Sequence, residues 1–257
     1  MKKQPQNSVY SAFAEIYDQV MRDVDYDSWA QYILTLCKRF DIKVQKILEL
    51  ACGTGSLALR LAKNRYEVVG IDFSEQMLKQ ARKKFKQEGL DISLYRGAME
   101  SFSPLKLDRD FDLIACLYDS LNYLLEEDKI MQCFEKSFAH IRPGGAFIFD
   151  VTTEYNLLHN FAGYTFAENF EDSSYIWENE YNLETKICIS KVSLFLKKRG
   201  YFEKHVEMHS QRVYSNADLM RMLGETGFEV LGTFHNITEL PVQNKCERIH
   251  FICQKPL

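Results

Sequence analysis

The chain has 257 residues, of which 46% are hydrophobic and 26% charged, with a formal net charge of −4 at pH 7. This length suits one large domain or a domain with a lid, and the apolar fraction is enough for a sizeable core. The charge balance argues against nucleic acid as a partner, and no run approaches the roughly 18 apolar residues that a membrane span needs. The seven scattered cysteines are typical of reduced thiols, which indicates a cytoplasmic protein. The first ten residues contain two lysines with no apolar run after them, so we expect no signal peptide.

The first part of the chain alternates between predicted helices and apolar strands. Residues 8–40 are predicted to be helical, with Asp27 or Ser28 as a helix cap, and Ser74 is predicted to cap a later helix. Further helices are predicted at 56–64, after Ser74 and at 126–141. Strands are predicted at 43–50, 66–72, 92–97, 111–117 and 146–151. This alternation predicts a mainly parallel, doubly wound sheet with helices on both faces.

The pattern changes after Val151. The segments 175–182, 186–196 and 201–214 alternate with a period of two residues, which predicts an antiparallel meander inserted after the fifth strand. A helix follows at 216–228, with Asn216 as a possible cap, and two strands at 228–236 and 247–255 complete the chain.

A glycine loop flanked by two acids is the main functional signal. Gly53 and Gly55 follow the first strand and open a helix, so backbone N–H groups can approach a ligand closely. With Ala58 they match the dinucleotide pattern Gly-x-Gly-x-x-Ala, which is weak evidence alone. Glu49 would repel a pyrophosphate, whereas Asp72 can accept hydrogen bonds from ribose hydroxyls. A nucleoside joined to a cationic amino acid therefore fits this pair of acids better, provided that both lie on one side of the sheet.

Four segments in this order resemble one family. "ELACGTG" and "VVGIDFSEQML", followed by "FDLIACLYDSLNYL" and "IRPGGAFIFD", resemble the class I S-adenosylmethionine-dependent methyltransferases. The resemblance implies a Rossmann-like seven-stranded sheet in the order 3-2-1-4-5-7-6, with the last strand antiparallel. It also implies S-adenosylmethionine as the cofactor.

The cofactor residues follow from this resemblance and from the charge argument. They are Tyr10, Tyr17, Glu49, Ala51, Gly53, Thr54, Gly55, Asp72, Phe73, Met77, Ala98, Met99 and Leu117. Tyr10 and Tyr17 belong to an N-terminal segment that closes over the cofactor in small-molecule members, although they also suit an aromatic core. The family's usual adenine-binding acid is replaced here by Ala98, which leaves backbone groups or Glu100 to bind the base.

The methyl acceptor is expected at the carboxyl ends of the strands, beneath the meander. The catalytic candidates are His209 as a general base, Tyr118 and Arg212. Strand parity places Glu203, His205, Glu207 and His209 on one face, which suits either a solvated face or one turned toward the acceptor. Cys246 and His250 supply too few ligands for a closed zinc site, so no metal is expected.

These features predict a methyltransferase acting on a small molecule, with an amine as one acceptor class. The expected division is an N-terminal helical cap (1–40), a cofactor-binding core (41–151 and 213–257) and an antiparallel β lid (152–212). We expect a monomer or homodimer without nucleic-acid or membrane partners. A nicotinamide-dependent oxidoreductase and a non-catalytic nucleoside-cofactor-binding protein remain as alternatives.

Overall fold

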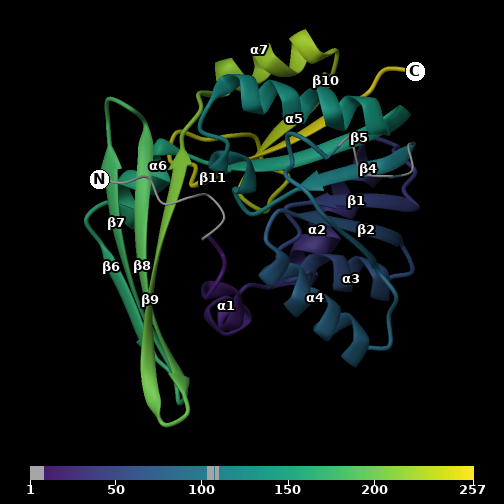
Figure 1. Cartoon of the computed structure of the whole chain (residues 1–257). Helices are drawn as coiled ribbons and strands as arrows, with labels where there is room; N and C mark the ends of the chain where they lie inside the picture. Colours follow the sequence, from purple (N-terminus) through teal and green to yellow (C-terminus); the bar gives the residue numbers. More distant parts are fainter. Residues whose placement is uncertain (1–8, 103–106, 108–109) are drawn as a thin grey trace.

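Two β-sheets organise the described part of the protein (Figure 1). The structure is a computed structural model that describes residues 9–102, 107 and 110–257. Among these residues the larger sheet has seven strands, in the order β10-β11-β5-β4-β1-β2-β3. They are β1 (Lys46–Leu50), β2 (Glu67–Asp72), β3 (Ser93–Arg96), β4 (Phe111–Cys116), β5 (Ile141–Thr152), β10 (Glu229–His235) and β11 (Arg248–Gln254). Because β11 runs antiparallel to both of its neighbours, the predicted strand order and direction are confirmed.

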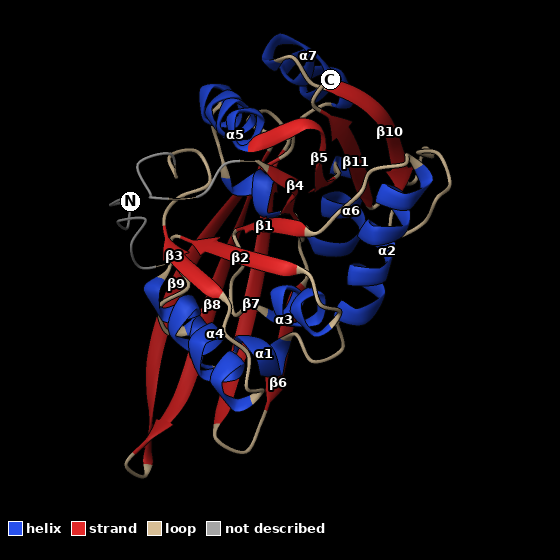
Figure 2. Ribbon diagram, turned by 90° about the vertical axis from the view of Figure 1, so that its right-hand side faces the viewer, coloured by secondary structure: helices blue, strands red, loops and turns tan. Residues whose placement is uncertain are grey.

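Helices cover both faces of this sheet, as Figures 1 and 2 show. One face carries α2 (Tyr26–Arg39), α3 (Ser56–Lys63) and α4 (Glu75–Gln87), and the other carries α5 (Glu127–His140) and α7 (Asn216–Thr226). A hydrophobic core cluster lies between each of these helix layers and the sheet. Successive side chains of β1, β4 and β5 point alternately into the two clusters, so each central strand is buried on both sides. This double burial explains why these strands are almost continuously apolar in sequence.

Three predicted boundaries in the main fold need correction. The helix of 8–40 is interrupted before α2, where Asp25 adopts a non-helical conformation and caps the helix by accepting from Ser28 N at 2.9 Å. The last large helix is likewise capped by Ser215 and not by Asn216. The fifth strand begins at Ile141, before the predicted 146, and has an irregular register against β4 around Pro143. The predicted cap at Ser74 is confirmed.

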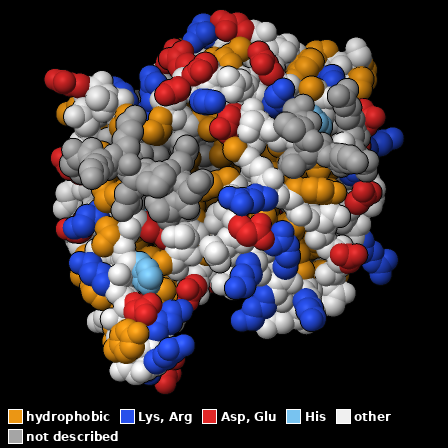
Figure 3. Space-filling model, in the orientation of Figure 1, with side chains coloured by type: hydrophobic (Ala, Val, Ile, Leu, Met, Phe, Trp, Pro, Cys, Tyr) orange, Lys and Arg blue, Asp and Glu red, His pale blue; other side chains and the backbone are white. Residues whose placement is uncertain are grey.

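The smaller sheet forms the predicted meander with one additional strand. Within the described residues its order is β6-β7-β8-β9, all antiparallel. The strands are β6 (Thr165–Asn169), β7 (Ser173–Asn182), β8 (Ile187–Lys198) and β9 (Tyr201–Arg212). The sequence did not predict β6, because this edge strand is exposed on both faces and lacks alternation. The space-filling view shows the small sheet extending below the core, with a notch between the two (Figure 3).

Five short helical segments of the described chain lie between or before the longer elements. They are η2 (Phe13–Glu15), α1 (Tyr17–Val20), η3 (Ser120–Tyr123), α6 (Glu154–Asn156) and η4 (Leu157–Phe161). Two of them, α6 and η4, link β5 to the small sheet. The segment containing η2 and α1 packs against the inner face of the small sheet, where Phe13 and Ile16 join Val192 and Leu194 in a third core cluster. Residues 1–8 of the predicted cap lie outside the described residues, and the three-part division of the chain stays a proposal.

No helix within the described ranges combines the length and apolar character required to cross a bilayer.

We predict that Phe149→Ala destabilises the fold by about 3–5 kcal/mol, because the cavity left in the core costs contacts on all sides. The Phe149 ring is fully buried and stacks on Phe251 with ring centroids 4.7 Å apart. Urea unfolding measures the change, with Phe202→Ala as the control because that ring is 52% exposed. Equal stabilities of the two variants would contradict the burial assigned to Phe149.

Candidate functional site

The glycine loop joins β1 to α3 and has the backbone geometry of a ligand-binding turn. Ala51, Gly53 and Gly55 all have positive φ angles, of 52°, 55° and 72°. A Cβ atom at Gly55 would lie 2.4 Å from Phe85 Cζ, so packing also requires glycine there. A Cβ at Gly53 would meet no atom within 4 Å, which leaves open space beside the loop. The first turn of α3 lacks a side-chain cap, so its N–H groups favour electron-rich ligand atoms.

Glu49 is a buried acid at the edge of this space. Its carboxylate accepts a backbone hydrogen bond from Ala58, while Oε2 is buried without a hydrogen-bond partner. Burial raises the pKa of Glu49 to about 8, and the nearby Asp72 adds to the rise. Glu49 pairs with Gly70 in the parallel sheet, so Glu49 and Asp72 project from the same face, as the ligand hypothesis requires.

Asp72 holds the second edge of the site. Its two oxygens accept backbone hydrogen bonds from Gly53 N and Ser74 N, each at 2.8 Å. Burial raises the pKa of Asp72 to about 6, although these two bonds oppose the rise. The backbone O of Asp72 accepts from Gly97 N at 3.0 Å, so the turn carrying Ala98 runs directly beside this acid.

Other predicted cofactor residues lie close to these two acids. Met77 is buried in the first turn of α4, where its N–H contacts the capping Ser74. Leu117 is buried just after β4, and Met99 packs with its sulfur 4.0 Å from Cys116 Sγ. Phe73 lies on the next position after Asp72 and is half-buried.

The N-terminal segment lies over the glycine loop. The backbone O of Tyr10 accepts from Ser74 Oγ at 2.8 Å, and Thr54 Oγ1 donates to Asp18 at 2.6 Å. The Tyr10 ring centroid lies 6.0 Å from that of Tyr17 and 6.3 Å from that of Phe73. Tyr10 and Tyr17 therefore line this side of the site and also belong to the aromatic packing around η2.

The loop after β4 has a strained backbone that Asp150 stabilises. Tyr118 and Asp119 have φ angles of 62° and 51°, which are unusual for residues other than glycine. Their N–H groups donate to the two oxygens of Asp150 at 2.6 and 2.8 Å. Arg248 bridges Asp150 and Asp119, and Gln211 of β9 donates to Asp119 at 2.7 Å. Two carboxylates therefore share one guanidinium.

The inward part of β9 brings His209 to the same region. His209 Nδ1 lies 3.3 Å from the Tyr123 hydroxyl, and its Nε2 lies 3.3 Å from Glu207 Oε2. The Tyr123 hydroxyl also contacts the Tyr10 hydroxyl at 2.6 Å. Glu207 and His209 are buried, whereas the side chains of Glu203 and His205, on the same face, are 41% and 39% exposed. The prediction of a solvated strand face is therefore wrong for the pair Glu207 and His209, and it holds for the partly exposed pair Glu203 and His205.

Arg212 is not brought together with His209. Its Nη1 donates to Leu125 O at 2.9 Å, and its guanidinium lies 5.0 Å from the Tyr214 ring centroid. This side chain lines a separate cavity of about 380 Å³ between the end of β5 and α7. Asn122 accepts from Thr152 N and donates to Arg212 O, which makes Asn122 a structural residue.

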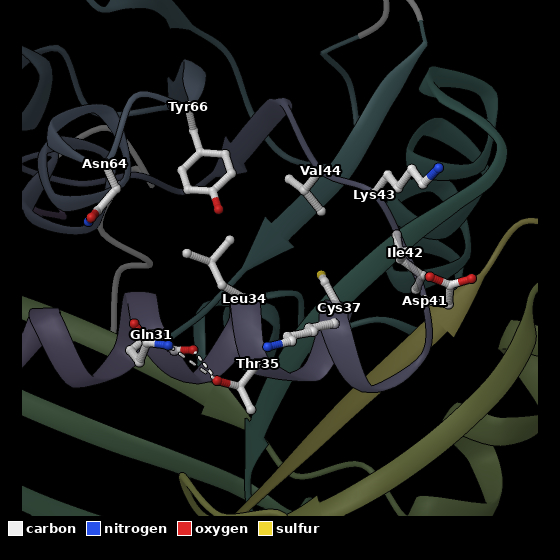
Figure 4. A pocket seen from close by; sticks show the side chains of 11 residues that line it. Gln31, Leu34, Thr35, Cys37, Asp41, Ile42, Lys43, Val44, Asn64 and Tyr66 are labelled. Atoms are coloured by element: carbon white, nitrogen blue, oxygen red, sulfur yellow. Dashed lines mark hydrogen bonds between the residues drawn. The ribbon is translucent and has the colours of Figure 1, made fainter.

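A groove of about 460 Å³ lies at the other end of the large sheet's strands from the glycine loop (Figure 4). Leu34 and Cys37 of α2 line it together with Val44 and Tyr66, which lie just before the start of β1 and of β2. It therefore lies near the amino ends of the strands, away from the carboxyl ends where ligands of such sheets bind. The burial of Cys37 raises its thiol pKa to about 12, so this cysteine is not a reactive nucleophile.

Several residues of the site were not predicted from the sequence. Asp150 and Arg248 were not singled out, although an acid ending the apolar run of the fifth strand is a detectable signal. Glu207 and Tyr123 were given no role in the site. Their contribution depends on contacts with the N-terminal segment, which local patterns do not reveal.

Comparisons with known proteins agree with this geometry. A family model described as "Methyltransferase domain" matches residues 47–145. A protein of Geobacillus sp. (strain WCH70), provisionally named as a methyltransferase, is 32% identical over 96% of this chain and 99% of its own length. An S-adenosylmethionine-dependent methyltransferase structure from Clostridium acetobutylicum ATCC 824 superposes with a TM-score of 0.83 at 29% identity, covering 96% of this chain and 99% of that one.

A relative of known substrate matches over a shorter region. The dTDP-3-amino-3,6-dideoxy-alpha-D-glucopyranose N,N-dimethyltransferase of Streptomyces fradiae is 31% identical over 146 residues, which are 56% of this chain and 54% of that protein. These findings favour the methyltransferase interpretation over a nicotinamide oxidoreductase.

We predict that the affinity for S-adenosylmethionine rises with pH up to about 8, the pKa of Glu49. The cationic ligand stabilises the ionised carboxylate of Glu49. Below pH 8 most free protein has Glu49 protonated, so binding releases a proton. In that range the dissociation constant falls by up to roughly tenfold for each unit that the pH rises. Isothermal titration calorimetry in buffers of different ionisation enthalpy measures both quantities.

Glu49→Gln is the control for this titration, because it removes the ionisable group while keeping the side-chain shape. The variant should lose most of the pH dependence and the matching proton release. An affinity that falls as pH rises, or an unchanged pH dependence in the variant, would contradict the assignment.

Proposed function

We propose that this chain, which belongs to the class I S-adenosylmethionine-dependent methyltransferases, methylates the nitrogen of a small amine. S-adenosylmethionine supplies a methyl group already activated on a sulfonium sulfur. The chain's residues fit this cofactor, because Glu49 has a buried oxygen without a partner and the space beside Gly53 is open. In this proposal Glu49 holds the amino group of the methionine part, and Asp72 holds the ribose.

The observation that carries the amine acceptor is an acid surrounded by tyrosines. They are Asp119 with Tyr10, Tyr17, Tyr118 and Tyr123. Burial raises the pKa of each tyrosine hydroxyl, and repulsion from the Asp119 carboxylate adds to each rise. Neutral tyrosine rings and a carboxylate attract a cation. Among the described residues, Arg248 pairs with both Asp119 and Asp150, so the formal charges of these three groups sum to one negative charge, which an ammonium group would balance. Burial raises the pKa of Asp119, and a cationic ligand beside it would favour its ionised form.

The named relatives support this acceptor class. The Streptomyces fradiae enzyme transfers methyl groups to the amine of a nucleotide-linked amino sugar, and a glycine N-methyltransferase of Mus musculus is 27% identical over 145 residues. Both names specify nitrogen as the methylated atom. Their acceptors differ in size, so the similarity supports the class of nucleophile and leaves the individual acceptor to experiment.

His209 is the proposed base for this acceptor. An amine must lose a proton to become nucleophilic, and a positioned base commonly contributes about 10²–10⁴-fold to the rate. The hydroxyls of Tyr10 and Tyr123 lie 2.6 Å apart, and Tyr123 lies 3.3 Å from His209 Nδ1. These contacts form a path along which a proton moves from the tyrosine-lined region to His209. Arg212 faces the separate cavity and is assigned no proton-transfer step.

A direct test supplies the protein with methyl-labelled S-adenosylmethionine and matched acceptors that carry an amine or a hydroxyl at the same position. We expect label in amino sugars or small amino acids and none in their hydroxyl counterparts. A metabolite extract run in parallel identifies the preferred acceptor. Labelling of hydroxyl compounds with no labelled amine would contradict the proposal.

We further predict that His209→Asn lowers kcat by about 10²–10⁴-fold while S-adenosylmethionine still binds, because the variant loses the proton acceptor. The matched control is His205→Asn, on the same strand face but with 39% of its side chain exposed, which should keep normal turnover. Steady-state kinetics with the preferred amine and calorimetry provide the two readouts. An unchanged kcat in His209→Asn would rule out a role as base.

A further inference from the structure

Glu207 of β9 organises the backbone at the start of the described chain. Its Oε1 accepts from Ser11 N at 3.0 Å, Ala12 N at 2.8 Å and Phe13 N at 3.1 Å. Its Oε2 accepts from Tyr10 N at 2.7 Å, and the Ser11 hydroxyl adds a further bond to Oε1 at 3.0 Å. Consecutive N–H groups that converge on one anion form a nest, and here the anion is a side chain 195 residues away.

This nest is directly connected to the cofactor site. Tyr10 adopts a left-handed conformation with φ 57°, and its carbonyl accepts from Ser74 Oγ. Ser74 in turn donates its N–H to Asp72, the proposed ribose-binding acid. The Tyr10 ring lies between Phe73 and His209, with centroids 6.3 and 4.7 Å away. A continuous set of hydrogen bonds therefore joins the small sheet to the crevice through one short segment.

We propose that Glu207 is a positioning residue for cofactor binding, which holds residues 10–13 in the turn that places Tyr10 against Ser74 and Phe73. The inference rests on the proposed cofactor site and adds a residue of the small sheet to it. Without an acceptor at this position, these four hydrogen bonds from neighbouring N–H groups in a largely buried segment would be lost, which disfavours the closed turn. Glu207 itself need not touch the cofactor.

A carboxylate suits this position because each of its hydrogen bonds with residues 10–13 comes from an N–H or O–H donor. Each Glu207 oxygen faces at least one backbone N–H, so an amide nitrogen at either position would meet a donor and not an acceptor. Glu207→Gln keeps the volume and shape of the side chain but turns one attractive contact into a repulsive one. The substitution therefore separates a need for the carboxylate from a need for packing.

The test compares Glu207→Gln with Glu203→Gln, a change on the same face of β9 where the side chain is 41% exposed. For the cofactor-free proteins, hydrogen–deuterium exchange of peptides covering residues 9–20 reports the turn directly. Calorimetry with S-adenosylmethionine reports the site. We expect faster exchange and an affinity loss of about ten- to a hundredfold in Glu207→Gln, and neither effect in the control, since the lost bonds involve a charged acceptor.

Exchange and affinity equal to those of the control would overturn the inference while leaving the methyltransferase function intact. Failure of the wild-type protein to bind S-adenosylmethionine would instead contradict the proposed function. Glu207→Asp provides a second test if the glutamine variant does not fold, because it keeps the charge but moves it back by one methylene. Its affinity should lie below that of the control, and equality with the control would again overturn the inference.

Discussion

The buried carboxylate of Glu49, with one oxygen lacking any partner, is the constraint on which the site depends. An ionised acid in such an environment is costly unless a cation reaches it, and burial accordingly raises its pKa to about 8. Asp72, on the same face, adds to the demand for positive charge. A dinucleotide's pyrophosphate would meet repulsion here, whereas a sulfonium nucleoside with an ammonium group relieves it. The same acids thus select the ligand and disfavour its closest structural alternative.

The site is completed by parts of the chain that are far apart in sequence. Tyr10 bonds to the core through Ser74 and to the small sheet through Glu207, so one segment is packed between cofactor and lid strands. On the other side, Asp119 contacts Gln211 of β9 as well as Arg248 of β11. In the proposed function, the cofactor and acceptor regions would therefore share the Tyr10 side chain. The small sheet therefore contacts both sides of the site, through Glu207 and Gln211 of β9.

Local signals in the sequence were enough for the central fold and the cofactor loop. The apolar strands, the pair Gly53 and Gly55, and the acids near the ends of β1 and β2 all lie within one strand–helix–strand unit. The site residues contributed by long-range contacts were harder to predict. Glu207 lies on a strand that looks amphipathic and solvated, and only the N-terminal segment packed on it gives the carboxylate its partners. The edge strand β6 was missed because it is exposed and lacks alternation, whereas the cap at Asp25 was missed although its bond with Ser28 N is local.

The most direct test of the central claim is a crystal structure with S-adenosylhomocysteine bound. We predict that the ligand's amino group lies within about 3 Å of Glu49 Oε2, with its ribose hydroxyls against Asp72 and its tail beside Gly53. Such a complex would give the unpaired oxygen the cationic partner that its burial demands. A ligand bound away from the glycine loop, or bound there with Glu49 Oε2 still unpaired, would contradict the account.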